Sequence, residues 1–357
     1  MLNTYVKQKN NSEMKRSLPL LILCLFYGSA TAGEITLATY NIEYFDRHFL
    51  AHHLSTNDLV KSGPGKELFD ELRKKNDEDN WETAQVILDP KFNPDILVIE
   101  EGCDQADLTY FNHRWLNDAY ATTIQFVSNT ERHQQLDLLM KPGFKILERK
   151  DQYYLEPDPV GNERGSRLFA RGPVFVKVQT PSGYVLWVGL THMKSKSMGG
   201  GEEGSDEKKS GGKEPDKSRQ RKIEVTKWRN REAFRTHEII KQLEKAGPPD
   251  VILLGDMNDS LGLDPYEGDG GGDAILNLVG PPEDGLILAT KPLADAKQIS
   301  FHGYWRTGFR ELIDHVIATR SMKDRLGEPR IVTDGLVRVA SDHFPVMIRV
   351  KEPAGKE

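Results

Sequence analysis

Strand-like segments bordered by chemically active side chains constrain the fold of this chain more than any other feature of its sequence. Six such segments alternate or are continuously apolar, as half-buried and buried strands are. The polar residues at their ends are Asn41 and Glu43, Glu100 and Glu101, Thr191 and His192, Asp256 and Asn258, Asp314 and His315, and Asp342 and His343. Because a sheet holds its strand ends rigidly, polar groups at several ends can meet at one site. The sequence therefore predicts a β-rich scaffold with one polar site at a sheet edge.

The rest of the hydrophobic pattern predicts the elements around that site. We expect strands at 35–42, 95–100, 122–127, 136–140, 174–179, 185–190, 251–254, 312–318 and 346–350. Helical spacing occurs at 81–88, 108–115 and 223–243, and a polar stretch with a turn at 63–65 precedes the first helix. Strands alternate with helices early and come in runs later. This order predicts an α/β (α+β) four-layered sandwich, with two mostly antiparallel β-sheets packed face to face and helices on both outer faces.

The N-terminus has the order of a secretory signal peptide. Lys15 and Arg16 precede an apolar run at 18–27, and Ala30-Thr31-Ala32 supplies a small-x-small cleavage site. The run is too short for a stable membrane anchor. A buried N-terminal helix is the less favoured alternative. We expect 1–32 to be an N-terminal extension and signal peptide, and the protein to be exported to a periplasm or out of the cell.

The remaining chain, 33–357, is expected to be a single catalytic domain. Residues 195–217 are built from Gly, Ser, Lys, Glu and Asp, a composition that cannot bury enough apolar surface to order itself. We therefore expect a disordered loop at about 195–217. Of the two cysteines, Cys24 lies in the predicted signal, so Cys103 is left alone and no internal disulfide is expected. Cys103 is interpreted as a packed small residue.

The overall charge is acidic. Because the segment before Gly33 has a net charge of +3, removing it changes the formal charge of the chain from −6 to −9. Such a chain is not drawn to nucleic acid by its overall field, so a polyanionic substrate must be held locally, by cations and a few arginines. The candidate ligands are oxygen atoms and histidines, without the Cys/His spacing of a zinc site. Oxygen ligands favour Mg²⁺, with Mn²⁺ or Ca²⁺ as alternatives.

These motifs, taken in order, resemble those of the endonuclease/exonuclease/phosphatase superfamily. They are Thr39-Tyr40-Asn41-Ile42-Glu43, Ile99-Glu100-Glu101, Thr191-His192-Met193-Lys194-Ser195, Gly255-Asp256-Met257-Asn258-Asp259, Ile313-Asp314-His315 and Ser341-Asp342-His343-Phe344-Pro345-Val346. A further segment, Phe169-Ala170-Arg171-Gly172-Pro173-Val174, resembles the Arg-x-Pro segment of the pancreatic-type deoxyribonucleases. Three features are most similar to bacterial predicted extracellular nucleases: the Asn-Ile-Glu opening at 41–43, the His-x-Lys-Ser-Lys run at 192–196 and the Arg-rich helix that follows the loop.

The resemblance implies a role for each position. Glu101 would be the principal Mg²⁺ ligand, with Asn41, Glu43 and Asp342 near the ion directly or through water. His343 would be the general base, held by Asp314, while Asp256 and Asn258 would align the attacking water and the phosphate. His192 would face the leaving oxygen or a non-bridging oxygen. Arg171 would contact a phosphate, and Asn258 would also contact the substrate.

Three positions depart from the family pattern. Glu100 stands where glutamine is usual, which puts an extra carboxylate beside the metal site. Glu43 stands where many members carry aspartate, and Thr191 replaces the commoner asparagine.

The chemistry of the residue types agrees with these roles. A divalent cation neutralises charge that grows on phosphate oxygens in the transition state. An imidazole can accept a proton from water near neutral pH, and a carboxylate partner fixes its tautomer. The two histidines can exchange the roles of acid and base, and the sequence leaves this open.

The sequence thus predicts an exported, Mg²⁺-dependent phosphodiester hydrolase, most consistent with a monomeric nuclease acting on DNA or RNA, with no protein partner implied. Endo or exo cutting is left open. One alternative keeps the site and changes the substrate to a phospholipid or a sugar phosphate, as in a sphingomyelinase-like enzyme, although no apolar hairpin for a membrane stands out after Gly33. A non-catalytic secreted binding protein is less favoured, because none of the motif residues is missing. His48, His52 and His53 are interpreted as solvent-exposed loop residues.

Overall fold

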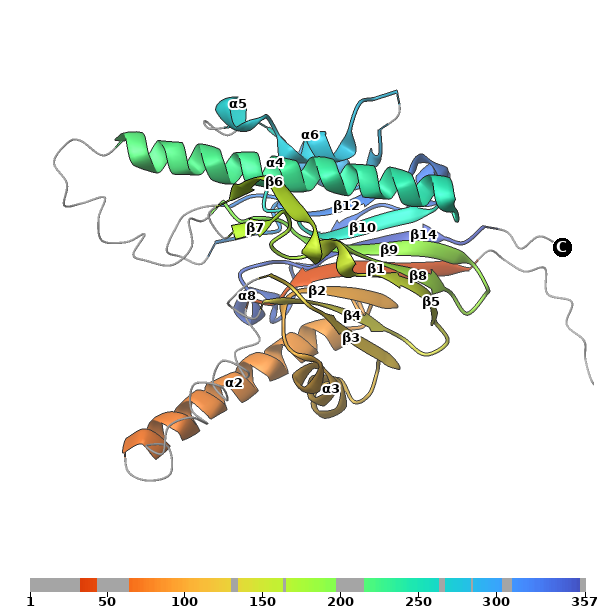
Figure 1. Ribbon diagram of the computed structural model, residues 1–357. Helices are drawn as coiled ribbons and strands as arrows, with labels where there is room; N and C mark the ends of the chain where they lie inside the picture. Colours follow the sequence, from red (N-terminus) through yellow and green to blue (C-terminus); the bar gives the residue numbers. More distant parts are fainter. Residues whose placement is uncertain are drawn as a thin grey trace, which may run out of the picture. The chain divides into compact units, whose positions relative to one another are not determined.

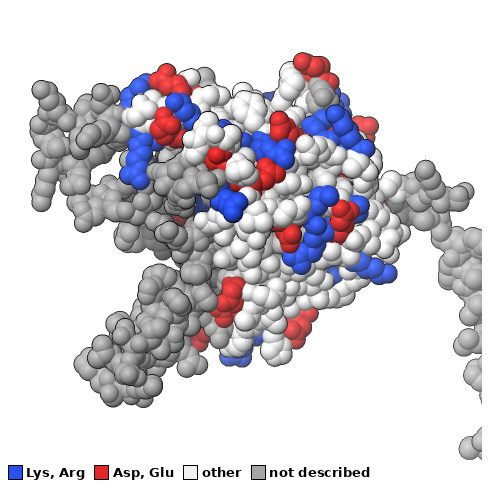
Figure 2. Space-filling model, viewed as in Figure 1, with Lys and Arg blue, Asp and Glu red and all other residues white. Residues whose placement is uncertain are grey.

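The computed structural model describes residues 33–43, 64–129, 134–162, 165–196, 215–262, 267–283, 285–303 and 310–353. All of them belong to one compact unit, Ala32–Glu357. The predicted N-terminal extension and signal peptide, the three loop histidines at 48–53 and most of the predicted loop at 195–217 lie outside the described residues. Within the described part, no helix is both long enough and apolar enough to cross a membrane. Basic and acidic side chains are intermixed on the face of the molecule shown in Figure 2.

Six strands form the first sheet, in the order β13-β14-β1-β2-β4-β3. Their bounds are β1 Glu34–Asn41, β2 Ile96–Gly102, β3 Thr122–Phe126, β4 Gln135–Met140, β13 Arg330–Ile331 and β14 Val346–Lys351. β1 and β2 run parallel, and the other neighbours run antiparallel. The carboxyl ends of β1 and β2 therefore lie side by side.

Six further strands form the second sheet, in the order β11-β12-β10-β9-β8-β5. Their bounds are β5 Lys145–Lys150, β8 Val174–Gln179, β9 Val185–His192, β10 Val251–Asp256, β11 Ile287–Leu288 and β12 Asp314–Ala318. β9 and β10 are again the parallel pair in an otherwise antiparallel sheet. A separate hairpin pairs β6 Pro157–Asn162 with β7 Gly165–Arg167.

The two sheets pack face to face, with helices on both outer sides (Figure 1). Alternate residues of the strands point into one apolar core between the sheets, among them Leu37, Val98, Val188 and Ile252. The opposite faces form two further cores, one under α2 Pro64–Leu88, α3 Gln105–Arg114 and α8 Val337–Ala340, the other under α4 Pro215–Ala246 and α6 Ala274–Val279. The predicted sandwich is confirmed, and its sheets are mostly antiparallel with one parallel pair each.

The short elements complete the unit. They are α5 Glu267–Gly270, α7 Lys291–Asp295 and the 3₁₀ helices η2 Gln152–Leu155 and η3 Arg320–Arg325. β5, the β6–β7 hairpin and these short helices were not predicted from the sequence. β5 alternates half-buried and exposed residues, because it lies at the edge of its sheet. The sequence of β5 is mostly polar, so apolar and polar residues do not alternate clearly enough to predict a strand.

Helices extend into two polar regions where the sequence predicted none. α2 begins at Pro64, inside the predicted turn at 63–65, and α4 begins at Pro215, inside the predicted loop at 195–217. Proline is favoured in the first turn of a helix, where its missing N–H has no intrahelical partner anyway. Charged residues with good helix propensity then continue each helix, as the Lys74–Glu78 pair at 3.7 Å shows in α2. A pattern search for apolar spacing finds only the later, buried part of each helix.

Candidate active site

The strand ends converge as the sequence predicted. Asn41, at the end of β1, lies in register with Glu100 of β2. In the second sheet, Asp256 at the end of β10 lies in register with His192 of β9 and with Asp314 of β12. Because β12 runs antiparallel to β10, its first residue lies beside the last residue of β10. The register thus aligns polar groups at one edge of each sheet, and the hydrogen bond from Asn41 Nδ2 to Asp256 Oδ2 at 3.1 Å joins the two edges.

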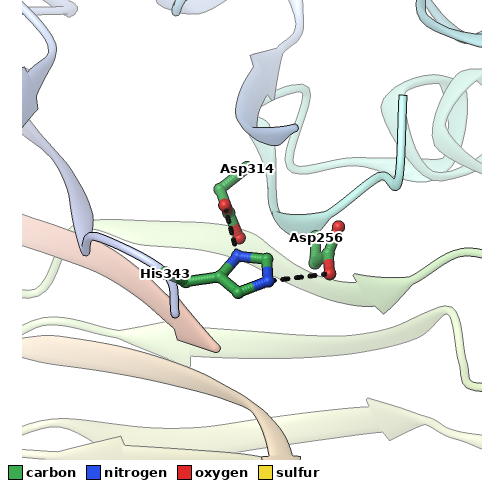
Figure 3. Close-up of side chains that lie close together, drawn as sticks. All are labelled: Asp256, Asp314 and His343. Atoms are coloured by element: carbon green, nitrogen blue, oxygen red, sulfur yellow. Dashed lines mark hydrogen bonds and ion pairs between the residues drawn. The ribbon is translucent and has the colours of Figure 1, made fainter. Parts of the chain in front are cut away.

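His343 lies at the centre of a buried group of acids (Figure 3). Its Nδ1 donates a hydrogen bond to Asp314 Oδ2 at 2.8 Å, and its Nε2 lies 3.9 Å from Asp256 Oδ2 and 3.8 Å from Asp342 Oδ1. Burial lowers the pKa of His343, but the negative charges of Asp314, Asp256 and Asp342 outweigh it and raise the pKa well above its usual value. The hydrogen bond to Asp314 fixes the orientation of the ring, and Nε2 faces Asp256 and Asp342.

Asp256 connects the two histidines. Its Oδ2 lies 3.3 Å from His192 Nε2 and accepts a hydrogen bond from Asn41 Nδ2 at 3.1 Å. Its Oδ1 accepts one from the backbone N–H of Asn258 at 2.8 Å. Burial opposes the charged form, but the two histidines lower the pKa of Asp256 below its usual range. Asp256 is thus held as a carboxylate between two imidazoles.

The two histidines have opposite electrostatic surroundings. Burial lowers the pKa of His192, the Arg171 guanidinium lowers it further, and Asp256 only partly offsets both effects. In the free protein His192 therefore favours the neutral form, while His343 favours the charged one. Because their pKa values are shifted in opposite directions, the two histidines are suited to act as a donor and an acceptor of protons.

Three carboxylates border this buried group on the side of the first sheet: Glu43, Glu101 and Asp342. Glu43 is exposed, while Glu101 and Asp342 are half-buried. Burial, and then the charge of Glu101, raises the pKa of Asp342 to about 6 despite the opposing effect of His343. Partial desolvation, Asp342 and Glu101 raise the pKa of Glu43 to about 7. We call these three residues the carboxylate side. A bound cation would relieve the repulsion between their negative charges.

Three residues at the same edge have an unusual backbone conformation. Glu43, Glu101 and Asn258 have φ angles of 46°, 56° and 51°, a region that side chains with a Cβ rarely adopt. Glu101 lies where the pairing of β2 with β4 shifts register between Glu100 and Gly102. Such a bulge re-aims a side chain at the end of a strand. Strained residues of this kind often cluster at active sites, where the surrounding structure holds them in place.

Two sets of groups could hold a metal ion. Ligand atoms of Asp256, Asp314 and His343 lie within 4.8 Å of one another. Asp314 and His343 are already hydrogen-bonded to each other, and Asp256 accepts bonds from two asparagines. On the carboxylate side, partial burial and then the charges of Asp342 and Glu101 raise the pKa of Glu43. This second set therefore offers the oxygen donors that a hard cation such as Mg²⁺ prefers.

Arg171 and Asn258 lie on the side of His192. Arg171 Nη2 and Asn258 Nδ2 both donate to the carbonyl oxygen of Met193, at 3.0 and 3.1 Å. The Arg171 carbonyl in turn accepts a hydrogen bond from the backbone N–H of His192 at 3.2 Å. Arg171 is buried, and its other terminal nitrogen donates to Gln134 Oε1 at 3.0 Å. Contact of Arg171 and Asn258 with a phosphate stays a prediction.

Glu100, one of the three positions that depart from the motif pattern, is completely buried beneath the site. Thr39 Oγ1 donates to its Oε1 at 2.5 Å. Burial and the charge of Asp314 raise the pKa of Glu100 well above its usual value, although the Thr39 hydrogen bond acts the other way. The side chain therefore favours the neutral acid, whose O–H can donate as the amide of a glutamine does.

Several supporting residues escaped the sequence analysis. The Ser300 hydroxyl accepts hydrogen bonds from the backbone N–H groups of Ile313 and Asp314, both at 3.0 Å. Phe301 packs on the His343 ring with a centroid distance of 4.9 Å. No local pattern marks these two residues, because they act through contacts that only the fold creates.

Two other supporting residues, Ser341 and Gly255, belong to motifs quoted in the sequence analysis, so the sequence did contain a signal for them. Ser341 Oγ donates to the Asn41 carbonyl at 2.7 Å and accepts from the His343 N–H at 3.0 Å, which joins the end of β1 to the loop before β14. Gly255 lies so close to β9 that a Cβ there would be 1.9 Å from the Thr191 carbonyl oxygen. Only glycine permits this approach of β10 to β9.

Other cysteine and histidine side chains of the described residues lie outside the reacting group. Cys103 is buried, as predicted, with its thiol 4.0 Å from Asp137 Oδ2. His302 packs against Phe344, and one ring nitrogen lies 3.0 Å from the Ser341 carbonyl. His315 is buried, with its two ring nitrogens near Thr290 Oγ1 and the Asp259 carbonyl.

Comparison with known proteins identifies the fold. No protein-family model matches the sequence, and no curated protein matches it. An endonuclease/exonuclease/phosphatase family protein of Bacteroides thetaiotaomicron matches with a TM-score of 0.53 at 15% identity, over 90% of this chain and 96% of the other. A mannosyl-6-phosphatase of the same organism gives 0.53 at 16%, over 88% and 98%. TDP2 of D. rerio, complexed with single-strand DNA product, gives 0.50 at 12%, over 89% and 98%. The chain therefore has the endonuclease/exonuclease/phosphatase fold.

Proposed function

We propose that the protein is a Mg²⁺-dependent phosphodiester hydrolase that cleaves DNA or RNA. The observation that carries the proposal is the position of His343, held by Asp314 at 2.8 Å and facing Asp256 at 3.9 Å beside the carboxylate side. This arrangement joins a proton-transfer group to a cation site at one edge of the fold, which is what metal-assisted hydrolysis of a phosphodiester requires.

The residues of the chain divide the reaction between them. Mg²⁺ on Glu43, Glu101 and Asp342, with Asn41 nearby, would supply a positive charge for the phosphate oxygens. In its neutral form, His343 would take the proton of the attacking water through Nε2, while Asp314 would stabilise the imidazolium that forms. With the roles exchanged, neutral His192 would be the base and charged His343 the acid.

The other side of the site serves the phosphate and the leaving oxygen. Asp256, between His343 and His192 at 3.9 and 3.3 Å, orients both rings. His192 faces the leaving oxygen, and Arg171 and Asn258 contact the phosphate. The attack is in line, and no covalent intermediate forms.

The choice of nucleic acid rests on two arguments. The motifs are most similar to those of extracellular nucleases, and one neighbour of the same fold is complexed with a DNA product. A sugar-phosphate esterase is the second candidate, because another neighbour of the same fold is a mannosyl-6-phosphatase.

A substrate panel tests the proposal. Purified protein would be incubated with plasmid DNA, single-stranded RNA, sphingomyelin and a sugar phosphate, each with Mg²⁺ and with EDTA. We expect cleavage of DNA or RNA with Mg²⁺ and none with EDTA. Turnover of sphingomyelin or the sugar phosphate alone would instead support the second substrate class, and turnover in EDTA would overturn the metal requirement.

We also propose that the protein is exported, on the strength of the basic, apolar and small-residue order of 15–32. N-terminal sequencing of the protein recovered from the periplasm or medium tests this. A mature N-terminus at Gly33 is expected, whereas an uncleaved chain in the cytoplasm would contradict it.

A further inference from the structure

Helix α4 contributes a buried carboxylate that contacts two loops of the site at once. Glu232 Oε1 accepts a hydrogen bond from the backbone N–H of Ala170 at 3.0 Å. Its Oε2 accepts one from the backbone N–H of Lys194 at 2.7 Å. The Glu232 residue is only 1% exposed, and the helix that carries it follows both loops in the sequence.

The two loops are those that carry Arg171 and His192. Ala170 precedes Arg171, and Lys194 follows His192 by two residues. The loops also contact each other, because the His192 N–H donates to the Arg171 carbonyl and Arg171 Nη2 donates to the Met193 carbonyl. Glu232 therefore closes a small ring of hydrogen bonds around the side of the site that we assign to the phosphate and the leaving oxygen.

Only a carboxylate suits this position. Two backbone N–H groups point at one side chain, and a carboxylate offers an acceptor oxygen to each. A glutamine could accept from one of them, and its NH₂ group would then oppose the other donor. Burial raises the pKa of Glu232 to about 7, although both backbone bonds and the charges of Arg171 and Lys194 act in the opposite direction. Burying an acidic side chain costs free energy, so Glu232 does more than fill space between the helix and the loops.

Neighbouring residues of α4 hold the same region. Trp228 Nε1 donates to the Leu168 carbonyl at 2.5 Å. Arg231 makes two bonds to Asp158, at 3.0 and 2.7 Å, and Arg235 makes two to Glu156, at 2.7 and 2.9 Å. Successive turns of α4 thus hold Glu156, Asp158 and Leu168 in place. Glu232 extends this hold to Ala170 and to the His192 loop, where Lys194 Nζ also lies 5.6 Å from the centroid of the Trp228 ring.

We propose that Glu232 is a positioning residue, which keeps Arg171 and His192 aligned on one phosphate by accepting the N–H groups of Ala170 and Lys194. This inference rests on the proposed function of the site. The sequence motifs do not include Glu232, because they lie at strand ends and Glu232 lies within a helix.

The test compares Glu232→Gln and Glu232→Asp with the wild-type protein and with Glu238→Gln. Glu238 is an exposed acid on the same helix, bonded to Arg235 at 3.0 Å, so its change is the matched control. We expect Glu232→Gln to lower kcat/KM about 10- to 100-fold, the usual size for a misplaced reacting group, and to weaken binding of inorganic phosphate in the presence of Mg²⁺. Amide hydrogen exchange at Ala170 and Lys194 should accelerate in the same variant.

Glu232→Asp keeps both acceptor oxygens on a shorter side chain, so we expect values between those of the wild type and Glu232→Gln, with a smaller risk of unfolding. Glu238→Gln should match the wild type in every measurement. Unchanged kinetics and phosphate affinity in folded Glu232→Gln, or equal defects in Glu232→Gln and Glu232→Asp, would overturn the inference. If the wild type cleaves no phosphodiester, the proposed function fails, and phosphate affinity and hydrogen exchange still decide the role of Glu232.

Discussion

The two sides of the site are built in different ways. On the buried side, His192, Asp256, Asp314 and His343 are all less than 5% exposed and are linked by contacts of 2.8 to 3.9 Å. On the carboxylate side, Glu43, Glu101 and Asp342 are exposed or half-buried, and the charges of Glu101 and Asp342 raise the pKa of Glu43. The buried side is held together by contacts among its own residues, whereas the carboxylate side gathers negative charges that repel one another.

The difference separates two requirements of the chemistry. Proton transfer needs fixed geometry and a tuned pKa, and burial with charged partners provides both. Cation binding needs oxygen ligands and access from solvent, because a hydrated ion must enter. Substitutions on the two sides should therefore fail in different ways, and that contrast can be measured.

The largest effect should come from removing the imidazole of the buried side. His343→Ala leaves the cation ligands in place but removes the base, so we expect kcat to fall by about 10⁴-fold, the upper end for general-base catalysis. Steady-state hydrolysis measures this, and circular dichroism checks that the variant is folded.

Asp256→Ala should also abolish turnover with the fold intact. Activity retained in either variant would refute the roles assigned here.

A smaller loss, with a shift in pH dependence, should follow from Asp314→Asn. Asp314 raises the pKa of His343, so removing its charge lowers that pKa and lets the base form appear at lower pH. We expect kcat to fall by about 10²-fold and the acidic limb of the pH profile to move to lower pH. If the alkaline limb moves instead, His343 acts as the acid and His192 as the base.

Glu101→Gln should change the metal requirement before it changes the proton chemistry. One negative charge fewer weakens attraction for Mg²⁺, so we expect the Mg²⁺ concentration for half-maximal activity to rise about tenfold, a loss of roughly 1.4 kcal/mol in cation binding. Saturating Mg²⁺ should recover much of the rate. A variant that stays inactive at every Mg²⁺ concentration would show that the two sides are not separable.

The smallest effect is expected at Glu100, the residue before Glu101. Glu100 favours the neutral acid, so Glu100→Gln replaces one neutral donor by another and keeps an oxygen for Thr39. Activity should stay within about threefold of the wild type, because no charge is removed, and the midpoint of thermal unfolding should be equal or higher. A large loss in Glu100→Gln, comparable with that of Glu101→Gln, would mean that Glu100 works as a carboxylate.

The sequence predicted those parts of the molecule that local patterns encode. The sandwich follows from strand periodicity, and the convergence of Asn41, Asp256 and Asp314 follows from their places at strand ends. The early parts of α2 and α4 were missed, because polar helices lack an apolar stripe.

The supporting residues of the site were harder to predict. Ser300 and Glu232 act through backbone N–H groups of segments distant in the chain, and the bulge at Glu101 depends on pairing with β4. Such contacts exist only once the tertiary structure brings the segments together.

The central claim is that a cation on the carboxylate side and His343 on the buried side act on one phosphate. A crystal structure of the wild-type protein with Mn²⁺ and phosphate, using anomalous scattering to locate the metal, tests it most directly. We predict Mn²⁺ among Glu43, Glu101 and Asp342, with the phosphate between the metal and His343. A metal bound instead by Asp256, Asp314 and His343, with the Asp314–His343 hydrogen bond broken, would contradict the account.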